Sequence, residues 1–453
     1  MLFACWLRQL RASGRQTMEY EQAVSRIRRL SQITKNKDIY GDCAAIAGGV
    51  FCPAHGIALA APYIRDAAIL IVGMAECAWY AKNSGEYYTF HKASDRFYCS
   101  VLEDTDVTFG FGDTLVEQIG QVARETNCAC VIVASTCIPE IIGEDLEAAA
   151  EAAQERIGIP VLLIHTSHFD ERCYEYEIAV ERLLLALGQL MKPQKKEPKT
   201  INLIGLELHG FGRTASRENE LTRLLALHGI RRNVTLLGDC TTGEIARAGT
   251  AQLNVVTHRV GIPLAKRMQE QLSVPWVYFP VTLEMRELDE AYCRIEEALG
   301  ISIPQRSLLR QGALETIDSA REVCRGKRVV NGGRPPDAIE TTAFLVSLGL
   351  EPILINAARL YPTTSGAIEA IRAAGYDPLV NYVANQHITA AIVERDAPDL
   401  YIGHGNAAFL QRLHCPKLES VLSENLFGYE AIREAADRIR LSLQAAETGG
   451  GEK

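Results

Sequence analysis

At 453 residues, the chain is long enough for two to four domains with buried cores, and its 47% hydrophobic and 23% charged composition is that of a globular protein. Its 47 basic and 56 acidic side chains give a net charge of -9, so it offers no basic surface for nucleic acid. No apolar run reaches the roughly 18 to 20 residues of a membrane helix, and residues 1–22 lack the apolar stretch and cleavage site of a secretion signal. We therefore expect a cytoplasmic protein that binds neither nucleic acid nor membrane.

An N-terminal extension, residues 1–37, precedes three blocks in which strands and helices alternate. The predicted domains are residues 38–195, 196–320 and 321–453. In the first, apolar runs such as "AAILIVGM" and "CACVIVAST" alternate with amphipathic stretches such as "DTLVEQIGQVARET", a pattern typical of a parallel sheet covered on both faces.

The polar stretch "MKPQKKEPKT" reads as a linker before the second block, which starts at "INLIGLEL". The third starts near "KRVVNGG" and continues through "DAIETTAFLVSLGLEPILIN". We expect an α/β protein of three Rossmann-like domains, with mainly parallel sheets flanked by helices. Ligands of such domains bind where strands lead into helices.

Thirteen cysteines are many for a reducing compartment, but the length and the wide cysteine spacing disfavour a secreted disulfide framework. Six of them lie in helical or strand patterns without a glycine-rich turn, and we expect them to be small buried hydrophobes. These are Cys5, Cys128, Cys130, Cys173, Cys293 and Cys324.

Three other cysteines lie at element boundaries. Cys77 and Cys137 follow apolar strands, and Cys52 precedes a proline and a glycine. Three thiols at turns of one domain could converge on an iron–sulfur cluster, because thiolates are its preferred ligands. Zinc is the competing interpretation, but structural zinc sites use close pairs such as C-x-x-C, and the chain has only the C-x-C of Cys128 and Cys130.

The segments around these cysteines resemble those of the nitrogenase component 1 family. The similar segments are "FCPAHGIALAAPYIRDAAILIVGMAECAWYA", "LEDTDVTFGFGDTLVEQI" and "STCIPEIIGEDLEAA", and weaker ones are "LLGDCTTGEIARAGTAQLNVV", "LAKRMQEQLSVPWVYFPV" and "APDLYIGHGNAA". The resemblance extends from about residue 40 to residue 435.

The resemblance implies a subunit that pairs with a related subunit, as in a heterotetramer, or with itself. A 4Fe–4S or larger P-cluster-like cluster would lie at the interface, and electrons would come from a separate ATP-dependent reductase of the Fe-protein type. Cys52, Cys77 and Cys137 match the cluster ligands, with Cys43 as a rival for the first position. Cys99 lies near a position where a relative has cysteine, and we expect a core thiol there.

The pattern departs from that of nitrogenase itself. His258 stands at or beside the expected middle-domain cysteine ligand, and the expected C-terminal histidine is missing. Dinitrogen reduction is therefore disfavoured. Three readings stay open: a non-catalytic partner subunit, a second complex iron–sulfur cofactor, or a small organic substrate without a second metal centre. Candidate catalytic residues are His258, Cys240 and His404, which follow strands; for His258 a structural role is the competing interpretation.

The first functional hypothesis is a subunit of a nitrogenase-like reductase, and we favour methylthio-alkane reductases, which cleave carbon–sulfur bonds. Tetrapyrrole reduction is the enzymatic alternative. A scaffold for cluster assembly and an α/β binding module with structural cysteines are the non-enzymatic ones. The chain has no P-loop, no complete dinucleotide fingerprint and no hydrolase motif, so ATP would be hydrolysed by another protein.

Overall fold

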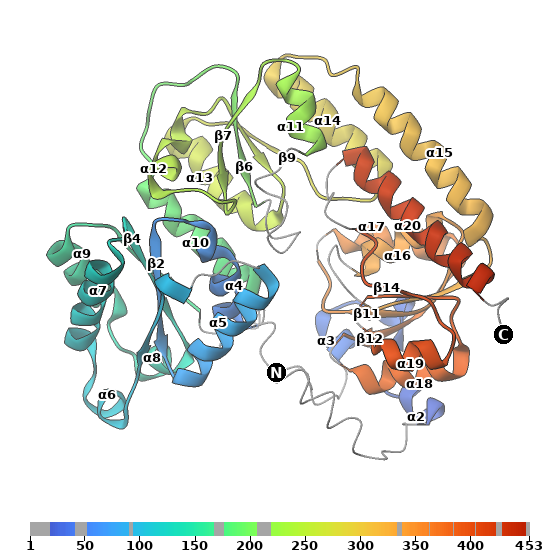
Figure 1. Cartoon of the computed structure of the whole chain (residues 1–453), viewed down its shortest axis with the longest axis horizontal. Helices are drawn as coiled ribbons and strands as arrows, with labels where there is room; N and C mark the ends of the chain where they lie inside the picture. The colour runs from blue at the N-terminus through green and yellow to red at the C-terminus, as the bar shows by residue number, and fades with distance from the viewer. Residues whose placement is uncertain are drawn as a thin grey trace. The chain divides into compact units, whose positions relative to one another are not determined.

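The computed structural model describes residues 19–40, 52–89, 94–166, 176–205, 219–332, 338–361, 363–383, 385–403, 405–422 and 428–449. Contacts divide the chain into a larger unit, Gly48–Ala313 with Leu422–Ile432, and a smaller unit, Met1–Ala47 with Leu314–Val421 and Arg433–Lys453. The three mainly parallel sheets with flanking helices confirm the predicted α/β class (Figure 1). The predicted domain boundaries stay a prediction. Within the described ranges, no helix combines the length and apolar character that a bilayer span requires.

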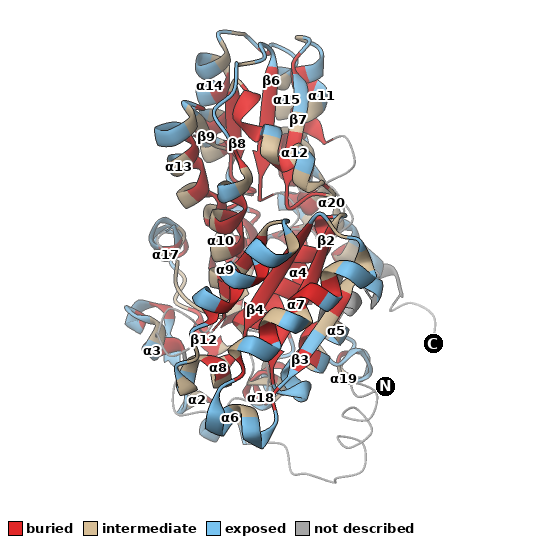
Figure 2. Ribbon diagram, turned by 90° about the vertical axis from the view of Figure 1, so that its left-hand side faces the viewer, coloured by how far each residue is buried: buried red, intermediate tan, exposed pale blue. Residues whose placement is uncertain are grey.

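The first sheet of the larger unit has the strand order β3-β2-β4-β5, and all its pairs are parallel. Its strands are β2 (Ala67–Gly73), β3 (Phe97–Val101), β4 (Cys130–Ser135) and β5 (Val161–His165). The neighbouring helices are α4 (Pro53–Ala60), α5 (Ala75–Thr89), α6 (Asp104–Phe109), α7 (Gly112–Thr126), α8 (Cys137–Ile142), α9 (Leu146–Ile157) and α10 (Tyr176–Leu187). Every residue of β2 and β4 is buried (Figure 2), as their continuous apolar runs predict.

The middle sheet, in the same unit, has the order β7-β6-β8-β9 and is also parallel. Its strands are β6 (Thr200–Ile204), β7 (Arg231–Leu236), β8 (Leu253–Val256) and β9 (Trp276–Tyr278). The helices of this region are α11 (Glu220–Ala226), α12 (Thr242–Ala246), α13 (Ile262–Leu272) and α14 (Met285–Leu299). In each sheet the chain begins at an inner strand, β2 or β6, adds the next strand on one side, and places the last two strands on the other side. A topological switch point therefore lies between β2 and β4 in the first sheet and between β6 and β8 in the middle sheet.

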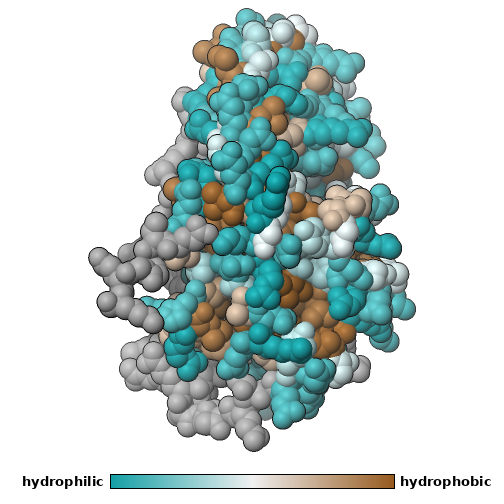
Figure 3. Space-filling view, turned by 90° about the vertical axis from the view of Figure 1, so that its right-hand side faces the viewer, coloured by the Kyte–Doolittle hydropathy of each residue, from teal (hydrophilic) through white to brown (hydrophobic). Residues whose placement is uncertain are grey.

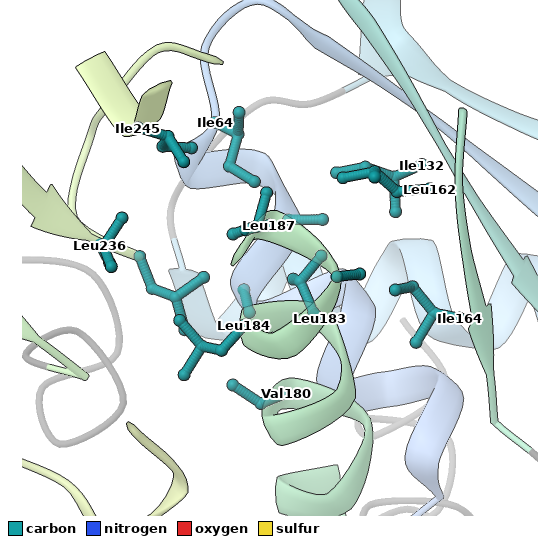
Figure 4. Close-up of a cluster of buried hydrophobic side chains, with 14 of the residues drawn as sticks. Ile64, Ile132, Leu162, Ile164, Val180, Leu183, Leu184, Leu187, Leu236 and Ile245 are labelled. Carbon is teal, nitrogen blue, oxygen red and sulfur yellow. The ribbon is translucent and has the colours of Figure 1, made fainter. Parts of the chain in front are cut away.

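Helix α10 supplies the apolar core between these two sheets. Its Leu183 and Val180 lie with Ile132, Leu162 and Ile164 of the first sheet in one buried cluster (Figure 4). The same cluster includes Leu236 and Ile245 of the middle region, on the other side of the helix in this view. A helix that is apolar on most of its circumference is expected where it is covered from both sides.

The smaller unit contains the third sheet, with the order β1-β12-β11-β10-β13-β14. Its strands are β1 (Arg28–Arg29), β10 (Arg328–Asn331), β11 (Glu351–Ala357), β12 (Leu379–Tyr382), β13 (Leu400–Ile402) and β14 (Lys417–Leu418). Its helices are α2 (Tyr20–Val24), α3 (Asn36–Tyr40), α16 (Ala338–Ser347), α17 (Thr364–Ala373), α18 (Gln386–Asp396) and α19 (Ala407–Arg412), while α15 (Arg306–Cys324) and α20 (Gly428–Gly449) contribute to both units.

Strand β1 comes from the predicted N-terminal extension and pairs antiparallel with β12, so residues 28–29 form an edge of this sheet. All other pairs of the sheet are parallel. The face shown in Figure 3 is mostly hydrophilic with separate hydrophobic patches, as expected for a protein surface.

Candidate metal centre

Cys52, Cys77 and Cys137 each lie at the beginning of a helix. Cys52 is the residue before α4, Cys77 lies in the first turn of α5, and Cys137 is the first residue of α8. Helices α5 and α8 follow β2 and β4, the two strands that flank the switch point of the first sheet. The positive end of a helix dipole favours a thiolate, so all three positions suit thiolate ligands. We call these three residues the thiol site.

The three thiols are close enough to interact electrostatically. Burial is the main cause that raises the pKa of Cys52, and the charges of Cys137 and Cys77 raise it further. Burial likewise raises the pKa of Cys77, followed by the charge of Cys137. The nearby backbone N–H groups of Ala54 and His55 lower the pKa of Cys52 and so act in the opposite direction. The raised pKa values favour the protonated thiols of Cys52 and Cys77, and metal binding has to release these protons.

A single metal ion does not fit this arrangement. Among the described residues, no group of three or more His, Cys, Asp or Glu side chains is arranged to hold one ion. The thiols thus interact by charge without forming a mononuclear site. Thiolates are the preferred ligands of iron–sulfur clusters, so the donor type fits a cluster.

Thr136 adds a second feature that fits a cluster. Its Oγ1 atom is buried and has no hydrogen-bond partner among the described residues, although it directly precedes Cys137. Gly73 makes room for it: a Cβ atom on Gly73 would lie 1.7 Å from Thr136 Oγ1. A buried hydroxyl without a partner is costly, and a cluster sulfur next to Cys137 would accept its hydrogen bond.

Other predicted cysteines have mixed outcomes. Cys130 and Cys324 are buried as expected, and Cys128 is half-buried. The predictions for Cys293 and Cys99 were wrong, because both are exposed. Cys293 lies on α14 away from its buried stripe of Leu288, Ala291, Tyr292 and Ile295, and Cys99 lies on β3, the edge strand of its sheet. Cys5, Cys43, Cys173 and His404 lie outside the described residues.

The His258 side chain is buried against other protein groups, two residues after the end of β8. Its Nδ1 accepts a hydrogen bond from the Val260 N–H at 3.3 Å, and its Nε2 lies 3.6 Å from Oε1 of Glu177. Glu177 also accepts hydrogen bonds from the Arg259 guanidinium at 2.8 and 3.1 Å. Burial lowers the pKa of His258 to about 3, so the ring is neutral. We call Glu177, His258 and Arg259 the middle-domain lock.

Cys240 connects the two sheets of the larger unit. Its N–H donates to the Tyr63 carbonyl at 2.9 Å, and its carbonyl accepts from the Arg65 N–H at 2.8 Å. Burial raises the pKa of its thiol to about 12. Neither Cys240 nor His258 is among the groups that shift the pKa of Cys52 or Cys77. The geometry gives both residues structural contacts, and their catalytic roles stay predictions.

A second cluster of titratable groups, not predicted from the sequence, lies beside the thiol site. His165, at the end of β5, lies between two carboxylates: its Nδ1 is 2.7 Å from Glu140 and its Nε2 is 2.9 Å from Glu147. The hydrogen bond to Glu140 is the main cause that raises the pKa of His165. Glu140 and His165 line an open pocket of about 530 Å³ together with Arg182, Gln189 and Arg267. The available signal was a glutamate three positions after Cys137 and a histidine that ends the next strand.

Comparison with known proteins defines the family. Residues 52–443 match the family described as nitrogenase component 1 type oxidoreductase. The chain belongs to this family. The nitrogenase iron-molybdenum cofactor biosynthesis protein NifE of Rippkaea orientalis (strain PCC 8801 / RF-1) is 26% identical over 371 residues, which are 78% of this chain and 76% of that protein.

An enzyme subunit is similar over a shorter region. The light-independent protochlorophyllide reductase subunit N of Synechococcus sp. (strain JA-3-3Ab) is 26% identical over 172 residues, 38% of this chain and 36% of that protein. Among solved structures, nitrogenase Cp1 at pH 6.5 has a TM-score of 0.72 at 16% identity, with 92% of this chain and 96% of that chain covered. This likeness confirms the fold, and the family membership confirms the resemblance seen in the sequence.

Proposed function

We propose that the chain is a subunit of an ATP-dependent nitrogenase-like reductase that holds an iron–sulfur cluster through Cys52, Cys77 and Cys137. The observation that carries the proposal is the convergence of three thiols, each at a helix beginning, at one edge of a parallel sheet. Such a cluster supplies one-electron transfer at low potential. The protein's own contribution is to position the thiolates and to donate a hydrogen bond from the Thr136 hydroxyl.

The cluster would be shared with a related subunit. Large apolar side chains with 39% to 85% exposure lie on β2–α5, β3, α6 and α8 or directly beside them, and they are Met74, Trp79, Val101, Val107, Phe109 and Ile141. They surround the same strand ends as the thiol site. Exposed apolar groups gathered in one region are typical of a protein interface, and covering them would also remove water from the thiols. A component-1-like partner subunit and a separate Fe-protein-type reductase complete the proposed assembly.

The substrate hypothesis is reductive cleavage of the carbon–sulfur bond in methylthio-alkanes, with tetrapyrrole reduction as the alternative. The His258 geometry bears on this choice because His258 stands at or beside the position where the resemblance implies a ligand of a second metal cofactor. Its Nδ1 accepts from Val260, its Nε2 faces Glu177 and it is only 6% exposed. These residues do not fit a cofactor ligand, which favours a substrate bound without a second metal centre.

A scaffold for cofactor assembly is a second candidate function. The observation that favours it is the match with the biosynthesis protein NifE, which extends over 78% of this chain. A scaffold and a reductase subunit would both hold a cluster at the thiol site. They differ in turnover: a scaffold releases its cluster to an acceptor, whereas a reductase subunit keeps it while substrate is consumed.

Anaerobic iron and sulfide quantification with EPR tests the thiol site. We expect cluster iron in the wild type, co-expressed with its partner, and its loss in Cys77→Ala. Cys293→Ala is the matched control, because that cysteine is exposed like Cys77 but lies on α14 of the middle region, and its loss should leave the iron content unchanged. Iron-free wild type, or equal iron in both variants, would contradict the proposal.

Turnover of the iron-loaded complex distinguishes the two candidates. Reductase, ATP and a methylthio-alkane are added, and the released thiol and alkane are measured. A parallel assay uses protochlorophyllide as the alternative substrate. Product formation with retained iron supports the reductase. Transfer of iron to an apo-acceptor without any product supports the scaffold.

A further inference from the structure

The Cys137 helix, α8, has little apolar packing to hold it in place. It has only six residues, Pro139 is its sole buried residue, and Ile141 is 62% exposed. An isolated helix of this length is not stable. Other contacts must therefore fix the direction in which the Cys137 thiol points.

Polar contacts from neighbouring elements supply this support. Glu140, one helical turn after Cys137, accepts a hydrogen bond from the Ser135 hydroxyl and lies 2.7 Å from Nδ1 of His165. The Thr166 hydroxyl donates to the Ser135 carbonyl. Residues on both sides of Cys137 are thus bound to the end of β5, which belongs to the rigid sheet.

The imidazole ring connects α8 to a second helix. Its Nε2 lies 2.9 Å from Glu147 in the first turn of α9, so one ring lies between carboxylates of α8 and α9. Two carboxylates on opposite ring nitrogens favour the imidazolium, which donates from both nitrogens. The backbone of His165 is fixed as well, because the Arg182 guanidinium of α10 donates a hydrogen bond to the His165 carbonyl.

We propose that His165 is a positioning residue: as an imidazolium between Glu140 and Glu147, it fixes the short helix that begins with Cys137 and thereby the aim of the Cys137 thiol. This inference rests on the proposed function, in which Cys137 is a cluster ligand. Ligand thiols need fixed directions, and the contacts behind a ligand set them.

Charged groups of the neighbouring helices surround the His165 ring. Glu140 of α8 and Glu147 of α9 are negative, while Arg182 of α10 and Arg267 of α13, which line the same pocket, are positive. The Glu140 hydrogen bond raises the pKa of His165 above its ordinary 6.5. Stabilisation by a group with a raised pKa is complete below the unfolded value and is lost as the pH rises through the folded value. The support of α8 should therefore weaken as the pH rises above the ordinary value of 6.5.

The test measures how readily Cys137 is alkylated in the full-length, cluster-free chain. Iodoacetamide labelling followed by peptide mass spectrometry gives the rate at Cys137 relative to Cys77 from pH 6 to pH 9. Each variant's ratio is divided by the wild-type ratio at the same pH, which removes the pH dependence of thiol ionisation. We expect the wild-type ratio to rise with pH, because α8 loosens as His165 loses its proton.

In His165→Gln the ratio should exceed the wild-type ratio on the order of tenfold at pH 6, because a charge-assisted hydrogen bond is lost. The excess should shrink as the pH rises and His165 of the wild type loses its proton. Glu140→Gln should behave alike. Glu151→Gln, an exposed change on α9, is the control and should match the wild type. If His165→Gln unfolds by circular dichroism, Glu147→Gln, whose side chain is 64% exposed, gives the same readout with a smaller rise. An excess in His165→Gln that does not shrink as the pH rises, or folded variants that match the wild type, would overturn the proposal.

Iron reconstitution separates this inference from the function on which it rests. If the labelling ratios change as expected while the wild type takes up no cluster iron, His165 positions Cys137 and the proposed function fails. If the wild type binds cluster iron and the ratios do not respond to His165→Gln, the thiol site stands and the positioning role fails.

Discussion

The first and middle sheets have the same topology, yet the residues at their corresponding strand ends differ: one is a partly exposed cysteine and the other is a buried histidine. Cys137 lies two residues after β4, and His258 lies two residues after β8, the third strand of each sheet in chain order. A buried threonine precedes each of them, with its N–H bound to Val72 or Ile204 of the first strand. In each sheet a glycine with positive φ then ends or follows that strand.

The difference begins at the threonine hydroxyl. Thr257 Oγ1 donates to the Ile204 carbonyl at 3.0 Å, whereas Thr136 Oγ1 has no partner among the described residues. Beyond it, the His258 ring is buried against Glu177 of α10, while the thiols of Cys77 and Cys137 are partly exposed. One scaffold position thus stays open for a ligand in the first sheet and is filled by protein in the middle sheet.

The lesson is that a strand-end position in a parallel sheet is an opportunity for binding, and neighbouring elements decide whether it is used. The middle-domain lock should therefore contribute to stability, and the thiol site should contribute to iron binding. Three predictions separate these two properties.

The largest expected effect is on the lock. Glu177→Ala removes a largely buried carboxylate that pairs with the half-buried Arg259 guanidinium and faces the buried His258 ring. We expect the free energy of unfolding to fall by about 3 kcal/mol, measured by urea denaturation. Iron per folded chain should not change. Glu270→Ala, an exposed change on α13, is the control. It should change the free energy of unfolding by less than about 0.5 kcal/mol and leave the iron per folded chain unchanged. A loss of stability comparable to that of Glu177→Ala would refute a specific role of Glu177.

A smaller effect is expected at the thiol site. Gly73→Ala would place a Cβ atom 1.7 Å from Thr136 Oγ1, so the turn before Cys137 must move. We expect a loss of between about 2 and 3 kcal/mol together with reduced cluster iron. Gly143→Ala is the control, since that glycine also has positive φ but no atom within 4 Å of the added Cβ. It should cost about 1 kcal/mol and retain its iron. Equal iron loss in both variants would show that backbone strain, and not crowding at Thr136, is responsible.

The smallest effect is a pH dependence of the lock. Burial lowers the pKa of His258 to about 3 from 6.5, so the unfolded chain binds a proton as the pH falls below about 6.5 while the folded chain does not. The free energy of unfolding should therefore decrease as the pH falls below about 6.5. Between pH 7 and pH 5, His258 should account for about 2 kcal/mol of this decrease. His258→Gln should flatten this part of the profile in urea midpoints. An unchanged slope would mean that His258 is already protonated in the fold or that other groups dominate.

The sequence by itself determined the elements and their order, because hydrophobic periodicity and strand-to-helix turns are local properties. The apolar runs at β2 and β4 predicted buried parallel strands, and the positions of Cys77 and Cys137 directly after them predicted thiols at one sheet edge. Both follow from the rule that parallel strands present the same ends together. The family resemblance came from the same local segments.

Only the tertiary structure decided which strand-end residues are open. Glu177 reaches Arg259 across 82 positions of sequence, so no local pattern could reveal this contact. The sequence signals the contact between His165 and Glu140 only by a histidine at the end of the next strand, and the packing of β5 against α8 decides it. The same reason explains the errors at Cys99 and Cys293: a strand's place at the edge of its sheet and a helix's uncovered face depend on neighbours that the local sequence does not contain. Exposure and pKa are properties of what surrounds a residue, and long-range packing sets those surroundings.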